Sequence, residues 1–196
     1  MEGSTPINPA TGMLKVIEKL LILGVEVIGI PCNTSHAPEI FGRVKRAVMS
    51  QCPRVRLIHL PTEVVRIIGE KQPPKCRIGL MATNGTCHSK IYQQLLGQSG
   101  YQAIVPPMDL QEQIVDRLIY DKKIGIKANS VDPTREAVSL WHKALDFFRL
   151  EQVNTIILGC TELSLIHHRH PEDGLTFIDT TDVLARALIR EATQPT

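Results

Sequence analysis

Two cysteines lie in matching surroundings in the sequence, and their chemistry sets the first question. Cys32 stands in "PCNT" just after the apolar run 25–30, and Cys160 stands in "GCTEL" just after the apolar run 153–159. A free thiol has a pKa of roughly 8.5, and the start of a following helix lowers it, so a thiolate is accessible near neutral pH. Two thiols on opposite faces of one bound carbon can each exchange a proton with it. The expected chemistry is therefore racemisation or epimerisation.

Small polar residues accompany both cysteines and also end a third apolar run. Asn33-Thr34 follow the first cysteine, Thr161-Glu162 follow the second, and "TNGT" (83–86) follows the run 76–82. In open α/β sheets, ligands bind outside the carboxyl ends of the strands, where the starts of helices favour an anion. None of the three loops has the glycine spacing of a nucleotide-binding loop. The sequence therefore favours a small anionic ligand, and a carboxylate is the first candidate. Donors of the loops would stabilise the carbanion that forms when the α-proton of such a ligand is removed.

Short β-branched runs alternate with longer amphipathic runs along the chain, which is typical of a parallel α/β fold. The expected strands are 25–30, 55–60, 76–82, 101–106, 153–159 and 175–179, and the expected helices are 12–24, 37–52, 62–70, 87–100, 109–123, 132–150 and 182–192. Thr62 and Asp132 are expected as N-caps, with Pro133 at the first position of its helix. The segment "KQPPK" (71–75) is typical of a linker.

Composition excludes several classes of protein. The 196 residues are 43% hydrophobic, which is enough for a sizeable core. The formal net charge is +2 and the basic residues are spread out, so neither a nucleic acid nor an anionic membrane is an expected partner. Glu26 interrupts the best candidate for a membrane span, Leu20 to Ile30. Five cysteines without disulfide-scaffold spacing, and no signal-peptide pattern, predict a reducing, cytoplasmic location.

The motifs "PCNTSH", "TNGT" and "GCTEL", in that order, resemble those of the aspartate/glutamate racemase family of cofactor-independent amino-acid racemases. The resemblance extends to "IYDKKIG" and "FIDTTDVLARA" and covers nearly the whole chain. It implies two pseudo-symmetric α/β lobes, each with a parallel sheet flanked by helices, and an active site in the cleft between them. Residues 1–72 plus 175–196 would form the first lobe, and residues 73–174 the second. It also implies a homodimer and no pyridoxal phosphate or other cofactor.

The resemblance also implies roles for individual residues. The catalytic cysteine pair of the family falls on Cys32 and Cys160, and its substrate is an acidic amino acid, aspartate or glutamate. The substrate-contacting positions fall on Asn33, Thr34, Thr83, Thr86, Thr161, Glu162 and, for the lysine of the family, Lys123, with Lys122 one step out of register. Hydantoin racemases and maleate isomerases in the same superfamily also use paired cysteines, but "GCTEL" favours the amino-acid branch.

The sequence also departs from the family at its start. Family members begin with a further strand, a glycine-rich loop and an arginine that grips the substrate carboxylate, whereas this sequence opens with "MEGSTPINP". The first lobe is therefore expected to be incomplete, with three strands (25–30, 55–60 and 175–179) and unpaired backbone groups at a sheet edge. A weak or inactive racemase is expected. The alternative from another class is a binding or assembly protein that has kept the motifs.

Several histidines and one further cysteine have two possible roles each. His36 either adjusts the nearby thiol or is an ordinary residue at the start of a helix, and Cys87 either lines the pocket or packs where its helix begins. The cluster His167-His168-Arg169-His170 lacks the spacing and the partner ligands of a metal site. It is expected to be a solvated loop, and no metal site is expected.

Overall fold

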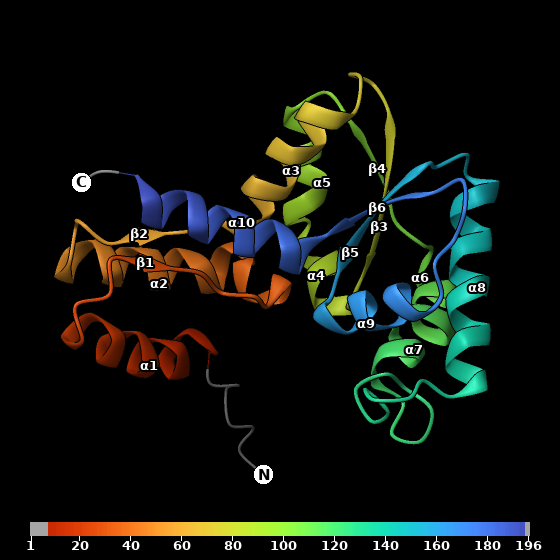
Figure 1. Cartoon of the computed structure of the whole chain (residues 1–196), viewed down its shortest axis with the longest axis horizontal. Coiled ribbons are helices and arrows are strands. Elements are labelled where there is room, and N and C mark those ends of the chain that lie inside the picture. Colours follow the sequence, from red (N-terminus) through yellow and green to blue (C-terminus); the bar gives the residue numbers. More distant parts are fainter. Residues whose placement is uncertain (1–7, 195–196) are drawn as a thin grey trace, which may run out of the picture.

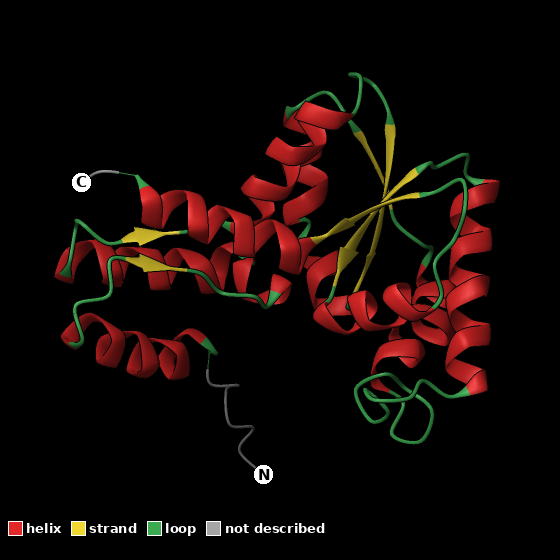
Figure 2. Cartoon of the chain, in the orientation of Figure 1, coloured by secondary structure: helices red, strands yellow, loops and turns green. Residues whose placement is uncertain are grey.

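The computed structural model describes residues 8–194 as helices and parallel strands built around two sheets (Figures 1 and 2). In chain order the elements are α1 (Ala10–Ile22), β1 (Val27–Ile28), the 3-10 helix η1 (Asn33–His36), α2 (Pro38–Gln51), β2 (Arg56–Leu57), α3 (Leu60–Lys71), β3 (Arg77–Ala82), α4 (Asn84–Ser89), α5 (Ile91–Gln98), β4 (Gln102–Ile104), α6 (Met108–Leu110), the π-helix η2 (Gln111–Asp116), α7 (Arg117–Tyr120), α8 (Arg135–Leu150), β5 (Thr155–Gly159), α9 (Thr161–Arg169), β6 (Thr176–Asp179) and α10 (Thr180–Thr193).

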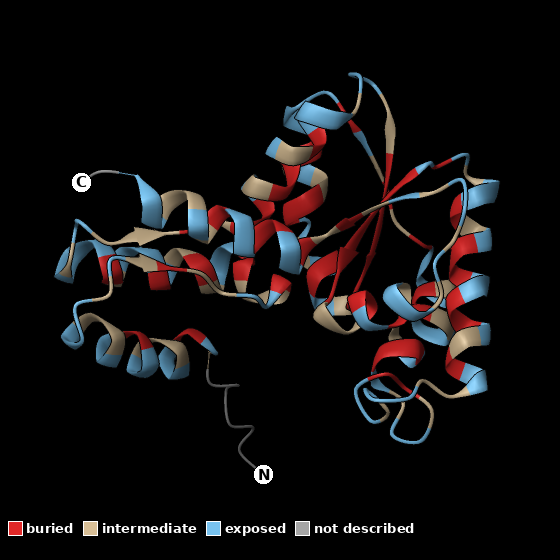
Figure 3. Ribbon diagram, in the orientation of Figure 1, coloured by how far each residue is buried: buried red, intermediate tan, exposed pale blue. Residues whose placement is uncertain are grey.

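The larger sheet has four parallel strands in the order β4-β3-β5-β6, with helices on both faces. Side chains alternate between the faces, as the two-residue period of a strand requires. Ile78 and Leu80 of β3 join the apolar core formed with α3, α5 and α10, whereas Met81 joins the core on the opposite face with α7, α8 and α9. Both faces of β3 and β5 are therefore buried (Figure 3).

The smaller sheet pairs β1 with β2, also in parallel, with Val27 opposite Arg56. Ile28 packs with Ile17 of α1 and Val44 of α2, while Val27 packs on the other side, against the core that contains α10. In Figure 1 this small sheet lies beside α10, between the helix and α2. Ile28 is the single buried side chain of these two short strands, and the other three side chains are half-buried, so this sheet depends on its three covering helices.

The expectation that residues 175–179 form a strand of the first lobe is wrong. β6 pairs with β5 at the edge of the four-stranded sheet, with Ile157 opposite Ile178. The unit β5-α9-β6 has the short connections of a parallel crossover, in which consecutive strands are usually neighbours. Phe177 and Ile178 contact the two opposite cores of the larger sheet. An apolar strand is stable where both of its faces are buried. The helices on the two faces of the four-stranded sheet bury those of β6.

Two helices from the segments expected in the first lobe cover the larger sheet as well. The buried side chains Leu60, Val64 and Ile68 of α3 lie in the same core as β3, and α3 packs against both α5 and α10. α10 contacts β5 and β6 at its start and β1 farther along. The expected boundary at residue 72 therefore separates α3 from the sheet that it covers. α3 and α10 join the two sheets physically.

Two expected helix starts also differ from the observed ones. α8 begins after Thr134, whose hydroxyl oxygen accepts a hydrogen bond from the N–H of Ala137, so the cap is Thr134 rather than Asp132. α3 begins after His59, and the hydroxyl of Thr62 lies 2.7 Å from Nδ1 of His59, so Thr62 lies within the first turn of the helix instead of capping it.

The expected helix 109–123 is divided into α6, η2 and α7 and ends at Tyr120. Within residues 8–194, no helix combines the length and apolar character needed to span a bilayer.

The observed cap of α8 gives a stability prediction. Thr134→Ala removes both the capping oxygen and the hydroxyl that donates to the carbonyl of Ile124 at 3.2 Å. We expect the free energy of unfolding to fall by about 0.5–2 kcal/mol, the usual cost of losing an N-cap. Chemical denaturation measures this change. The exposed Asp132 supplies the matched control: Asp132→Ala should change the free energy by less than about 0.5 kcal/mol, and the reverse order would restore Asp132 as the cap.

Candidate active site

The carboxyl ends of β1, β3 and β5 meet around one cavity of about 180 Å³. Thr83 follows β3 and Cys160 follows β5, and these strands pair with Ala82 opposite Gly159, so both residues lie at one edge of the sheet. Pro31, Cys32, Asn33 and Thr34 reach the cavity from the smaller sheet, and Tyr120, Lys127, Gly159, Thr161 and Glu162 complete its lining. The structure therefore brings the two cysteines, expected as a pair from the sequence, to a single cavity.

Three threonine hydroxyls join the loop of the smaller sheet to the end of β3. Oγ1 of Thr34 lies 3.0 Å from that of Thr83 and 2.9 Å from that of Thr86, and the last two are 3.1 Å apart. Gly85 permits this approach, because a Cβ atom at that position would lie 2.8 Å from Cγ2 of Thr34. Thr86 is fully buried and does not line the cavity. It supports Thr34 and Thr83 from behind.

Asn33 lines the cavity, yet both ends of its amide are bonded to the protein. Its Oδ1 accepts a hydrogen bond from the hydroxyl of Tyr92 at 2.5 Å, and its Nδ2 donates to Oγ1 of Thr180 at 3.1 Å. Its exposed fraction is 3%. The side chain expected from the resemblance to contact the substrate is therefore held in a buried network.

Cys160 and Glu162 form a directly bonded pair in the cavity. The thiol of Cys160 donates to Oε2 of Glu162 at 2.8 Å, the hydroxyl of Thr161 donates to the same oxygen at 2.9 Å, and Nζ of Lys127 lies 2.7 Å from Oε1. Burial, followed by the hydrogen bond to Glu162, raises the pKa of Cys160 to about 12. Burial alone would raise the pKa of Glu162, but its hydrogen bonds outweigh burial and lower this pKa to about 2. The shared proton therefore resides on sulfur.

The two thiols differ strongly in their surroundings. Cys160 is buried, whereas Cys32 is exposed and precedes the four-residue helix η1. All five cysteines of the chain are free thiols, so neither member of the pair is held in a disulfide. The arrangement offers one thiol kept protonated and a second that is open to solvent. The two thiols of this small cavity therefore have unequal surroundings.

The cavity contains a lysine that differs from the one implied by the resemblance. Lys123 is exposed in the turn after α7 and does not line the cavity, whereas Lys127 does. Nζ of Lys127 also lies 5.2 Å from the ring centroid of Tyr120, within the range of a cation–π interaction. Neither Tyr120 nor Lys127 was among the expected site residues. The motif "IYDKKIG", quoted for the resemblance, contains this tyrosine and ends two residues before this lysine.

His36 is fully buried beneath the Cys32 loop and serves its structure. Its Nε2 lies 2.9 Å from the carbonyl oxygen of Ile30, and its ring packs against Phe41 and His59. Because a carbonyl oxygen only accepts, Nε2 carries the proton. Burial lowers the pKa of His36 to about 4, so the ring is neutral at physiological pH. It holds the end of β1 and contributes no charge to the thiol.

The expectation that residues 167–170 form a solvated loop is wrong for their first three members. His167, His168 and Arg169 form the last turn of α9. The His167 ring packs 4.2 Å from that of Phe177, measured between centroids, and burial lowers its pKa. In the part of the chain that the structure describes, no group of three or more His, Cys, Asp or Glu side chains is placed to hold a metal ion.

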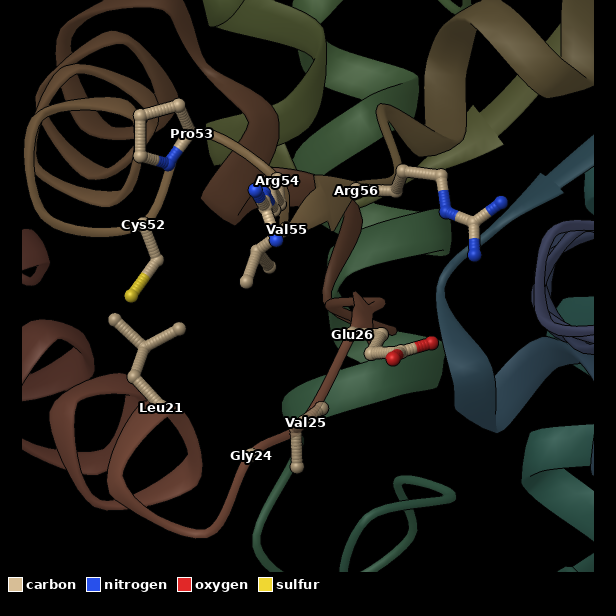
Figure 4. A pocket seen from close by; sticks show the side chains of 9 residues that line it. All are labelled: Leu21, Gly24, Val25, Glu26, Cys52, Pro53, Arg54, Val55 and Arg56. Atoms are coloured by element: carbon tan, nitrogen blue, oxygen red, sulfur yellow. The ribbon is translucent and has the colours of Figure 1, made fainter. Parts of the chain in front are cut away.

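A larger cavity of about 420 Å³ lies at the other end of the smaller sheet (Figure 4). Its lining includes Glu26, Arg54 and Arg56 together with apolar side chains, and its single cysteine is Cys52. This cavity has no second thiol and no bonded donor–acceptor pair like that of Cys160 and Glu162. Size alone therefore does not identify the candidate site, and the smaller cavity is the one that both Cys32 and Cys160 line.

Comparison with known proteins assigns the chain to a family. The sequence profile of the family described as Asp/Glu/Hydantoin racemase matches residues 3–188, which is nearly the whole chain. The chain belongs to this family. The expectation drawn from the three motifs is confirmed.

Several known proteins are similar to this chain. The broad specificity amino-acid racemase RacX of Bacillus subtilis (strain 168) is 27% identical over 171 residues, which cover 87% of this chain and 66% of that protein. The chain thus matches slightly less than two thirds of that relative's length. Picrophilus torridus aspartate racemase has a TM-score of 0.72 at 21% identity, covering 96% of this chain and 71% of that one. A putative Asp/Glu racemase from Yersinia pestis has a TM-score of 0.72 at 24% identity, covering 94% and 74%. The α/β fold with parallel sheets flanked by helices is confirmed.

The bonded pair at Cys160 predicts how its reactivity changes with pH. Because its pKa is about 12, alkylation of Cys160 by iodoacetamide should rise by roughly tenfold per pH unit between pH 8 and 10, without a plateau. Glu162→Gln removes a carboxylate that favours the protonated thiol, so the pKa should fall and alkylation at pH 8 should become faster. Mass spectrometry of the labelled peptides measures each cysteine separately.

Cys87 provides an internal control for this experiment. Burial, with a smaller contribution from Asp116, raises its pKa to about 12 as well, but Glu162 does not contribute. The alkylation profile of Cys87 should therefore be the same with and without Glu162→Gln. An unchanged profile for Cys160 would contradict the assigned hydrogen bond.

Proposed function

We propose that the chain racemises an amino acid by exchanging the α-proton between Cys32 and Cys160. The observation that supports this proposal most is that both thiols line one cavity although they come from different sheets. Membership of the Asp/Glu/Hydantoin racemase family supports the same reaction class. Other members are named as racemases of aspartate, of glutamate and of amino acids broadly.

In the proposed reaction, one thiolate removes the α-proton and the opposite thiol returns a proton to the other face of the carbon. The electrons of the C–H bond pass to the α-carbon and its carboxylate, and the S–H proton of the second cysteine then forms the new C–H bond. Cys160 is the donor in the direction that begins from its protonated form, and Cys32 is then the base. The reverse direction exchanges these roles, so the step needs no oxidant, reductant or external base.

An acidic amino acid is the proposed substrate. Lys127 has three N–H donors, of which one meets Glu162, so the others are free to bind a substrate carboxylate. Among the residues described around the cavity, it is the single lysine or arginine. The hydroxyls of Thr34 and Thr83 also line the cavity, and their protons can rotate towards a bound ligand, whereas the hydroxyl of Thr161 already donates to Glu162. These donors would stabilise negative charge that develops on the substrate carboxylate.

Exchange into heavy water tests the reaction. Incubation with L-aspartate or L-glutamate should place deuterium at the α-carbon and form the D-enantiomer, as followed by mass spectrometry and chiral chromatography. Cys32→Ser and Cys160→Ser should each slow racemisation by roughly 10²–10⁴-fold, because a hydroxyl is a much weaker acid than a thiol. Cys52 lies outside this cavity, so Cys52→Ser should not change the rate of racemisation. Aspartate binding without exchange at the α-carbon would instead favour a binding protein.

A pair of lysine variants tests the substrate class. Lys127→Ala should weaken aspartate binding by about tenfold or more, since hydrogen bonds to charged groups contribute roughly 1.5–3 kcal/mol. Lys123→Ala, at the position implied by the resemblance, should leave binding within about twofold because that side chain lies outside the cavity. Isothermal titration calorimetry with aspartate and alanine measures both. Equal affinities for the two amino acids in the unmodified chain would count against an acidic substrate.

A further inference from the structure

A continuous chain of buried hydrogen bonds runs between the two cysteine segments. The hydroxyl of Tyr92 donates to Oδ1 of Asn33 at 2.5 Å, and Nδ2 of Asn33 donates to Oγ1 of Thr180 at 3.1 Å. The hydroxyl of Thr180 then donates to the carbonyl oxygen of Leu158 at 2.8 Å. Tyr92 and Thr180 are fully buried, so water does not compete for these bonds.

The direction of every bond in this chain follows from its last member. The carbonyl of Leu158 can only accept, so the single hydroxyl proton of Thr180 must point to it. Oγ1 of Thr180 therefore accepts from Asn33, which fixes the orientation of the amide and leaves Oδ1 for Tyr92. Burial raises the pKa of Tyr92, so its hydroxyl stays a donor. Each of the four groups finds a partner of the matching kind.

Two members of this hydrogen-bond chain lie close in sequence to the two thiols. Asn33 directly follows Cys32, and Leu158 lies two residues before Cys160 in β5. Because Cys32 comes from the smaller sheet and Cys160 from the larger, strand pairing does not join them. The hydrogen bonds through Asn33 and Thr180 therefore connect the two segments directly.

We propose that Tyr92 and Thr180 are positioning residues that set the separation of the two reactive thiols. This role rests on the proposed racemisation, in which both sulfur atoms must reach opposite faces of one carbon. Neither residue lines the cavity, so each acts through Asn33. Misplacement of a reacting group by about 1 Å can cost on the order of 10²-fold in rate. The hydroxyls of Thr83 and Thr86 hold Thr34 in place, and this second set of hydrogen bonds holds the neighbouring Asn33.

Variants of Thr180 test the proposal. Thr180→Val keeps the shape but removes the hydroxyl, and Thr180→Ser keeps the hydroxyl. With Val, we expect backbone hydrogen exchange in peptides covering residues 30–37 to accelerate by about tenfold. We also expect kcat to fall by about tenfold or more while KM stays within about twofold. Ser should restore both quantities. Thr193→Val, on the same helix but with an exposed hydroxyl, is the matched control and should change neither.

The possible outcomes separate this proposal from the proposed function. Unchanged hydrogen exchange at residues 30–37 in Thr180→Val would overturn the connection, whatever the activity. Accelerated exchange with unchanged kcat would overturn the positioning role. If the unmodified chain shows no α-proton exchange, the proposed racemisation fails, and hydrogen exchange still decides whether the connection exists. If Thr180→Val does not fold, Tyr92→Phe removes the first hydroxyl, keeps the ring, and should give the same changes.

Discussion

The hydrogen bonds of the Cys32 loop, directly to the end of β3 and through Thr180 of α10 to β5, are the constraint on which the cavity depends. The smaller sheet offers only two residues per strand, so it cannot by itself fix its loop against the larger sheet. Threonine and asparagine side chains are short, and their hydrogen bonds form only where the two backbones come close together. The absence of a side chain at Gly85 allows this approach to Thr34. The geometry of the site thus follows from polar contacts between sheets and from α3 and α10, which pack across both.

The cavity is chemically asymmetric although its two cysteine motifs look alike. Glu162 accepts a hydrogen bond from the thiol of Cys160 and is itself held by Lys127 and Thr161, whereas Cys32 is exposed to solvent. Burying a carboxylate is costly unless its oxygens are bonded, and here three donors satisfy them. This arrangement keeps a negative charge beside a buried thiol without making the thiol a thiolate.

Local sequence patterns predicted the carboxyl ends of β3, β5 and β6 and both cysteines because those signals lie within a few residues of each other. The same patterns could not show which sheet receives β6, since an apolar strand looks alike beside β5 or β1. They also could not select Lys127 over Lys123, because residues 121–134 follow no helical or strand period. The bond from Tyr92 joins residues 59 positions apart, and that from Asn33 to Thr180 joins residues 147 positions apart. Such contacts depend on the finished fold and have no local signature.

The path of α10 has a consequence for the order in which the chain can fold during synthesis. Leu184 and Leu188 of this helix pack against the backbone at Gly29, so they cover the face of the smaller sheet opposite α1 and α2. The ribosome must translate residues 58–179 after β2 before it reaches this helix. At a synthesis rate of about 5–20 residues per second, this face of the smaller sheet stays exposed for on the order of ten seconds before α10 is made. During that interval β1 and β2 present apolar surface and unpaired strand edges, which are features that promote aggregation of a nascent segment.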